Sequence, residues 1–97
     1  MKKIIYKYHL SGGHKKDGYA LKTISIPLHS NIISFGVDAN NEPCIWVLQK
    51  PQPNQEMREV IFKIAVTGAE FELSSNDIHQ ATINVKGDIY HIFECKN

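Results

Sequence analysis

The chain of 97 residues lacks long hydrophobic runs, sustained helical periodicity and an excess of either charge. No segment approaches the roughly 20 apolar residues of a membrane-spanning helix, and Ile4-Ile5-Tyr6 is too short for the apolar part of a secretory signal. The 11 basic and 10 acidic residues leave a net charge of +1, which disfavours polymeric nucleic acid and anionic membranes as partners. We therefore expect a cytoplasmic protein with neither partner.

Cysteine is scarce, and no histidine lies in a metal-binding pattern. The two cysteines, Cys44 and Cys95, are not in CxxC spacing, and we predict reduced thiols that pack as small hydrophobic groups. The five histidines show neither HxH nor HxxxH spacing, and none pairs with a nearby cysteine or carboxylate. We predict no metal and no cofactor, because a site assembled from distant strands would have no support in the sequence.

The motifs of catalysis are missing as well. The chain has no GxSxG elbow and no cysteine with a neighbouring histidine, and its carboxylates are scattered singly. The glycine-rich segment SGGHKKDG, residues 11–18, could cradle a phosphate, but it lacks GxxxxGK[ST] and no helix follows it. We interpret it as a hairpin tip. The sequence predicts no catalytic residue and no enzyme.

What the sequence does contain is repeated alternation of apolar and polar residues, the pattern of half-buried strands. Glycine, proline and asparagine separate the alternating stretches at regular spacing. We predict a single all-β domain over residues 1–97, an antiparallel sandwich or partly open barrel of about seven short strands. The alternating stretches are residues 4–10, 24–28, 31–37, 43–49, 58–67, 81–85 and 89–93.

Three local features follow from the turn signals. Residues 31–49 should form a hairpin that turns near Asn40-Asn41, because asparagine tolerates positive φ. The segment from Ser74 to His79 could form one short helical turn at most. Across the Lys86-Gly87-Asp88 turn, we expect Ala81, Ile83 and Val85 to pair with Ile89, His91 and Phe93. The expected core comprises Ile24, Ile26, Phe35, Val37, Ile45, Val47, Phe62, Ile64, Ile83 and Phe93.

The chain also contains aromatic and basic side chains that could contact a ligand. Trp46, the only tryptophan, could fill the core or present a flat ring to a ligand, and Arg58, the only arginine, could bind phosphate or form a surface ion pair. His91 could be a satisfied interior or interface histidine or a ligand contact. The candidate ligand-binding set is Trp46, Lys50, Arg58, Thr67, Gly68, Phe71 and His91.

Five motifs in order give the chain a family resemblance: YKYHL, ISIP, NEPCIWVL, REVIFKIAVTG and YHIFE. Together they span nearly the whole chain and resemble a family of small uncharacterised proteins found largely in bacteriophages and prophages. Two departures stand out, since the family's GTGH turn reads Val66-Thr67-Gly68-Ala69 here and SGGHKKDGYALKT precedes ISIP as a longer insertion. The resemblance implies a phage-encoded accessory protein and transfers no site residue.

By analogy with small phage proteins that sequester nucleotide immune signals, our leading hypothesis is a sponge for a cyclic oligonucleotide that binds without cleaving. The alternative is a structural or protein-binding module that inhibits a host protein through a sheet edge. A small enzyme ranks last. Mixing the protein with cyclic nucleotides and then releasing them by heat separates the three hypotheses.

Apolar residues on both faces of several strands predict self-association. Ile4-Ile5, Ile32-Ile33, residues 45–48 and residues 60–62 each offer an apolar side chain to both faces, whereas a sandwich buries only one. We therefore predict a homo-oligomer, a dimer or tetramer, that covers the second face. Trp46 should then lie at a subunit interface with a ligand pocket beside it.

Overall fold

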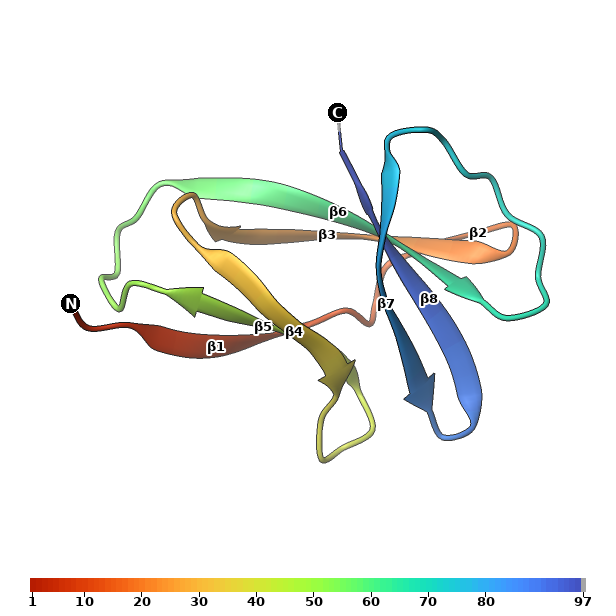
Figure 1. Cartoon of the computed structure of the whole chain (residues 1–97), viewed down its shortest axis with the longest axis horizontal. Helices are drawn as coiled ribbons and strands as arrows, with labels where there is room; N and C mark the ends of the chain where they lie inside the picture. Colours follow the sequence, from red (N-terminus) through yellow and green to blue (C-terminus); the bar gives the residue numbers. More distant parts are fainter. Residues whose placement is uncertain (97) are drawn as a thin grey trace.

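A computed structural model, which describes residues 1–96, contains eight strands in two antiparallel sheets (Figure 1). The predicted all-β class is confirmed. No helix forms among those residues, so the described chain has no helix that could cross a membrane. The strands are β1 (Ile4–His9), β2 (His14–Lys16), β3 (Tyr19–Pro27), β4 (Asn31–Val37), β5 (Pro43–Gln49), β6 (Met57–Val66), β7 (Asp77–Val85) and β8 (Asp88–Cys95).

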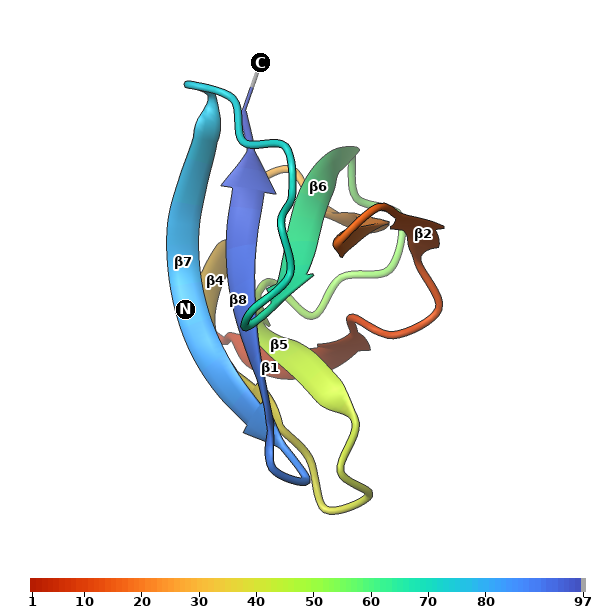
Figure 2. The same cartoon turned by 90° about the vertical axis from the view of Figure 1, so that its right-hand side faces the viewer.

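The two sheets face each other as a sandwich and do not close into a barrel. One has three strands in the order β1-β5-β4, and the other has five in the order β2-β3-β6-β8-β7. Figure 2 shows β7 and β8 curving along one side of the molecule. The core between the sheets is one cluster of buried residues: Leu10, Ile24, Ile26, Ile45, Val47, Val60, Phe62, Ile83 and Ile92.

Most of the expected core is confirmed, and the exceptions follow from strand pairing. Phe35, Val37 and Ile64 are partly buried against the cluster, and Phe35 meets Phe62 edge to face with ring centroids 5.8 Å apart. Phe93 is a wrong prediction, because its cross-strand partner is Lys63 on the outer face of the five-stranded sheet. Cross-strand partners point to the same side of a sheet, so Phe93 points away from the core.

The β7–β8 hairpin corrects a predicted register. Its turn has two residues, Lys86 and Gly87, with φ values of 53° and 93°, which are typical of a type I′ turn. We expected three turn residues, and a slip of one residue moves every side chain to the opposite face. Ile83 therefore pairs with Tyr90, and Ala81 with Ile92, rather than with His91 or Phe93.

The glycine-rich segment contains a strand that the sequence pattern did not indicate. β2 pairs with the start of β3 across the turn Asp17-Gly18. Gly18 has a φ of +81°, and a Cβ there would collide with the carbonyl oxygen of Glu70. Only glycine therefore lets this hairpin tip lie directly against the connection between β6 and β7.

That connection, residues 67–76, covers part of the outer face of the five-stranded sheet. Phe71 packs against Phe93 and Tyr19, with ring centroids 5.7 and 6.4 Å away. Beneath it, the buried Lys63 donates to Asp77 Oδ2 at 2.7 Å. Residues 74–77 form a single turn, in which the Asp77 amide donates to the Ser74 carbonyl at 3.1 Å, and no helix follows because β7 begins at Asp77.

Candidate functional site

The predicted ligand-binding residues do not form one site, because β6 separates them. Arg58 lies near the start of this strand and Thr67 just beyond its end. At about 3.3 Å per residue, the strand holds them about 30 Å apart. Figure 1 shows the β5–β6 connection, which begins with Lys50, and the β6–β7 connection, which contains Gly68, at opposite ends of the long axis. One small ligand cannot contact both groups.

Trp46 lies on the outer face of the three-stranded sheet and outside the core cluster. It pairs with Lys7 on β1 and Ser34 on β4, and it is only partly buried. A Cβ on Gly36 would be 3.4 Å from its ring, which is van der Waals contact, so the indole lies over this part of β4. Of the two interpretations of Trp46, the one that makes it a core residue is wrong, because the residue lies outside the core cluster.

Lys50, one of the two predicted cations, lines an open hollow of about 370 Å³. The hollow is lined by His29, Lys50, Gln52, Gln55 and Glu56. Arg58 does not line it, and its guanidinium donates to the Ser30 carbonyl at 3.4 Å. The Glu56 carboxylate would repel an anion placed beside Lys50. This end of the molecule is therefore a poor phosphate site.

Thr67 and His91 do meet, in a hydrogen-bonded row on the outer face of the five-stranded sheet. His91 Nε2 is 2.7 Å from Thr67 Oγ1, and its Nδ1 is 3.0 Å from Thr82 Oγ1. His79 Nε2 continues the row at 3.2 Å from the same Thr82 oxygen. Because both nitrogens of His91 have partners, the structure favours a satisfied histidine over a ligand contact.

A hollow beside the β2–β3 hairpin has the lining that best suits an anion. Its volume is about 440 Å³, and no carboxylate is among the residues that line it. Gly12 has a φ of +82°, and a Cβ there would be 3.8 Å from Lys22 Nζ. A Cβ on Gly13 would collide with the Leu21 carbonyl. The lining residues are Gly12, Gly13, His14, Lys16, Leu21, Lys22, Thr23 and Ile61.

Neither Lys16 nor Lys22 is in the predicted set; the sequence held a signal for Lys16, whereas Lys22 lies outside it. SGGHKKDG combines paired glycines with lysines, and we discounted a phosphate site because no helix follows. In the structure the hairpin itself brings Lys16 to β3, which carries Lys22. The pairing of β2 with β3, rather than the N-terminus of a helix, therefore provides the positive charge of this hollow.

The fold and this hollow define an antiparallel β-sandwich with a cationic, glycine-lined hairpin at one end. The chain belongs to the family described as a domain of unknown function (DUF7352), whose model matches residues 1–97. No curated protein and no solved structure matches the chain.

Proposed function

We propose that this protein binds and sequesters a small anionic ligand of the nucleotide class without altering it. The observation that carries the proposal is the hollow beside the β2–β3 hairpin, where Lys16, Lys22 and His14 line a surface with no carboxylate. Lysine ammonium groups and the exposed backbone of Gly12 suit phosphate oxygens. Leu21 and Ile61 add apolar area for a base or sugar.

The absence of catalysis in this proposal is supported by the Cys44 thiol, which lies next to a histidine but is held in its protonated form. Cys44 lies 3.6 Å from His9 Nδ1, but burial and the neighbouring Asp38 carboxylate raise its pKa. A thiol with a raised pKa is a weak nucleophile. The resemblance to phage proteins supports the host cytoplasm as the setting, and the analogy with small phage proteins that sequester nucleotide signals supports a cyclic oligonucleotide as the anion.

The direct test is to mix the protein with cyclic di- and trinucleotides and to follow its melting temperature. A ligand bound by the folded state raises apparent stability by RT ln(1 + [L]/Kd). Heating the complex should then release the ligand chemically intact, as judged by chromatography. A cleaved ligand would identify an enzyme, and no shift with any nucleotide would favour a protein-binding module.

Two charge-matched double variants locate the site. Lys16→Gln with Lys22→Gln removes two cations at the hairpin, and Lys50→Gln with Arg58→Gln removes two at the opposite end. We expect the first pair to weaken binding by more than about tenfold, since hydrogen bonds to charged groups contribute about 1.5–3 kcal/mol. The second pair should bind normally. The reverse result would move the site to the β5–β6 connection.

A second candidate function, self-association, is favoured by the outer face of the three-stranded sheet. Ile5 is 53% exposed and Ile33 50% exposed, and the strands that carry them flank β5, which carries Trp46 and Leu48. Apolar side chains gathered on one sheet face are typical of protein interfaces. A second copy of this chain is the partner we propose, as a dimer or a tetramer.

A further inference from the structure

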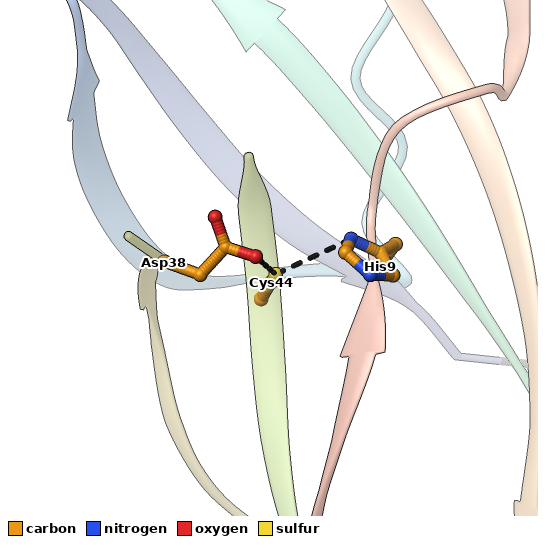
Figure 3. Close-up of side chains that lie close together, drawn as sticks. All are labelled: His9, Asp38 and Cys44. Atoms are coloured by element: carbon orange, nitrogen blue, oxygen red, sulfur yellow. Dashed lines mark hydrogen bonds between the residues drawn. The ribbon is translucent and has the colours of Figure 1, made fainter. Parts of the chain in front are cut away.

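Three potential metal ligands from separate strands converge at one end of the three-stranded sheet (Figure 3). His9 ends β1, Cys44 lies near the start of β5, and Asp38 directly follows β4. Antiparallel pairing brings them together, because His9 is the cross-strand partner of Cys44. Their ligand atoms all lie within 4.8 Å of one another.

The distances match a tetrahedral metal site. Bonds of about 2.3 Å to sulfur and about 2.0–2.1 Å to nitrogen or oxygen place neighbouring ligand atoms about 3.3–3.6 Å apart. Cys44 Sγ is 3.6 Å from His9 Nδ1 and 3.6 Å from Asp38 Oδ2. Two of the three ligand pairs therefore already have the spacing that a bound ion requires.

The carboxylate is held in place by its own turn. Asp38 Oδ1 accepts hydrogen bonds from the amides of Asn40 and Glu42, at 2.9 and 3.0 Å. These bonds leave Oδ2 directed at Cys44, and such outer contacts orient ligands in known metal sites. Asn41 makes the turn possible with a φ of 60°. The backbone of this turn thus holds the Asp38 carboxylate in the orientation that the proposed site needs.

We propose that His9, Asp38 and Cys44 bind one divalent zinc-type ion, with water or a partner group as the fourth ligand. Thiolate, imidazole and carboxylate together favour Zn²⁺ over the oxygen-seeking Ca²⁺ and Mg²⁺. Binding converts the Cys44 thiol to a thiolate and releases one proton to solvent. The metal goes beyond the anion-binding function, since the hairpin hollow shares no residue with this cluster.

Lys7 occupies the position of a competing cation. Its ammonium is 2.8 Å from Asp38 Oδ2, the same oxygen that faces the sulfur. Its side chain is 39% exposed, so it can move into solvent when an ion takes that oxygen. Replacing Lys7 with Met removes this competition. The proposal therefore expects tighter metal binding in Lys7→Met, whereas a purely structural ion pair would give no such gain.

Titration of the chelator-treated, reduced full chain with Co²⁺ provides the test. Tetrahedral coordination by a thiolate gives visible d–d bands and near-ultraviolet charge-transfer absorption, and added Zn²⁺ should displace them at one ion per chain. Trp46 gives an independent readout, because a Cβ on Gly36, the cross-strand partner of Cys44, would be 3.4 Å from its ring. Bound Co²⁺ should quench the fluorescence of this single tryptophan.

Matched variants decide the outcome. His9→Ala changes an exposed residue and should leave the fold intact while weakening Co²⁺ binding by at least about tenfold. Cys44→Ser should abolish the charge-transfer band. The control variants Cys95→Ser and His14→Ala should bind Co²⁺ as the wild type does. Absence of saturable one-to-one binding, or equal binding by wild type and His9→Ala, would overturn the proposal.

Discussion

Lys63 and Asp77 form the most buried ion pair among the described residues. The lysine side chain is 9% exposed and the aspartate side chain 4% exposed. The ammonium also donates to the Glu72 carbonyl at 2.6 Å and lies 4.9 Å from the centre of the Tyr19 ring. Lys63 thus links β6 to β7 and to the connection that covers them. Because both charges are buried, removing either side chain leaves the other charge without a partner and should lower the stability of the fold.

Replacing Asp77 with Asn should destabilise the protein by about 3 kcal/mol, because the buried ammonium of Lys63 loses its counter-charge. Urea denaturation measures the change. The control is Glu59→Gln, which removes an exposed carboxylate on β6 and should change stability by less than about 0.5 kcal/mol. Lys63→Met combined with Asp77→Leu should recover most of the loss, and failure to recover would contradict the ion-pair account.

The same pair predicts a pH dependence. The hydrogen bond from Lys63, helped by the Ser74 amide, lowers the pKa of Asp77 from 3.8 to about 2. Since the folded pKa lies below the unfolded one, the stabilisation is complete above about pH 4 and is lost as the pH falls through 2. The stability gap between wild type and Asp77→Asn should therefore narrow over this range. A constant gap would show that the charge of Asp77 does not stabilise the fold.

At the level of residues, alternation identified the inward positions Ile45 and Val47 but could not identify Lys63 as buried. Lys63 lies on the polar side of its strand, and only a connection that folds back over that side buries it. The predicted ligand-binding residues are spread over the molecule for a similar reason. Arg58 and Thr67 looked close along the chain, whereas an extended strand turns a short sequence separation into a long distance.

At the level of elements, the β4–β5 hairpin was predictable because its signal, Asn40-Asn41 between two alternating stretches, is local. Residues 31–49 form the expected hairpin, and Asn41 adopts the expected positive φ. The pairing of β1 with β5 joins segments far apart in the chain, and no local signal encodes it. The cluster of His9, Asp38 and Cys44 depends on that pairing. It could not be found without the sheet order.

Substitutions in the β7–β8 turn test its assignment as a type I′ turn. Lys86 adopts a φ of 53°, a conformation in which a lysine is strained and an asparagine is favoured. Lys86→Asn should therefore stabilise the protein by about 0.5 kcal/mol, and Gly87→Ala, at a φ of 93°, should destabilise it by about 1 kcal/mol. Denaturant midpoints would measure both. Equal effects of the two changes would contradict the assigned turn.

For the whole molecule, the two outer faces differ in how they are covered. The connection of residues 67–76 covers part of the five-stranded sheet with Phe71. The corresponding face of the three-stranded sheet has no such connection among the described residues, and Ile5 and Ile33 lie exposed there. This asymmetry assigns the proposed subunit interface to the three-stranded sheet. Trp46, which is outside the core cluster, lies on this same face.

Light scattering at micromolar concentration should therefore give a mass at least twice the 11.0 kDa of one chain. Ile5→Lys should shift the protein toward the monomer, because a charge in the middle of an apolar interface is costly to bury. Leu73→Lys is the matched control, since Leu73 is 55% exposed but lies in the connection over the other sheet. If the wild type has the mass of a monomer, or if the two variants dissociate equally, the three-stranded face is not the interface. Trp46 emission, shifted to the red in Ile5→Lys and unchanged in Leu73→Lys, would report the loss of that contact directly.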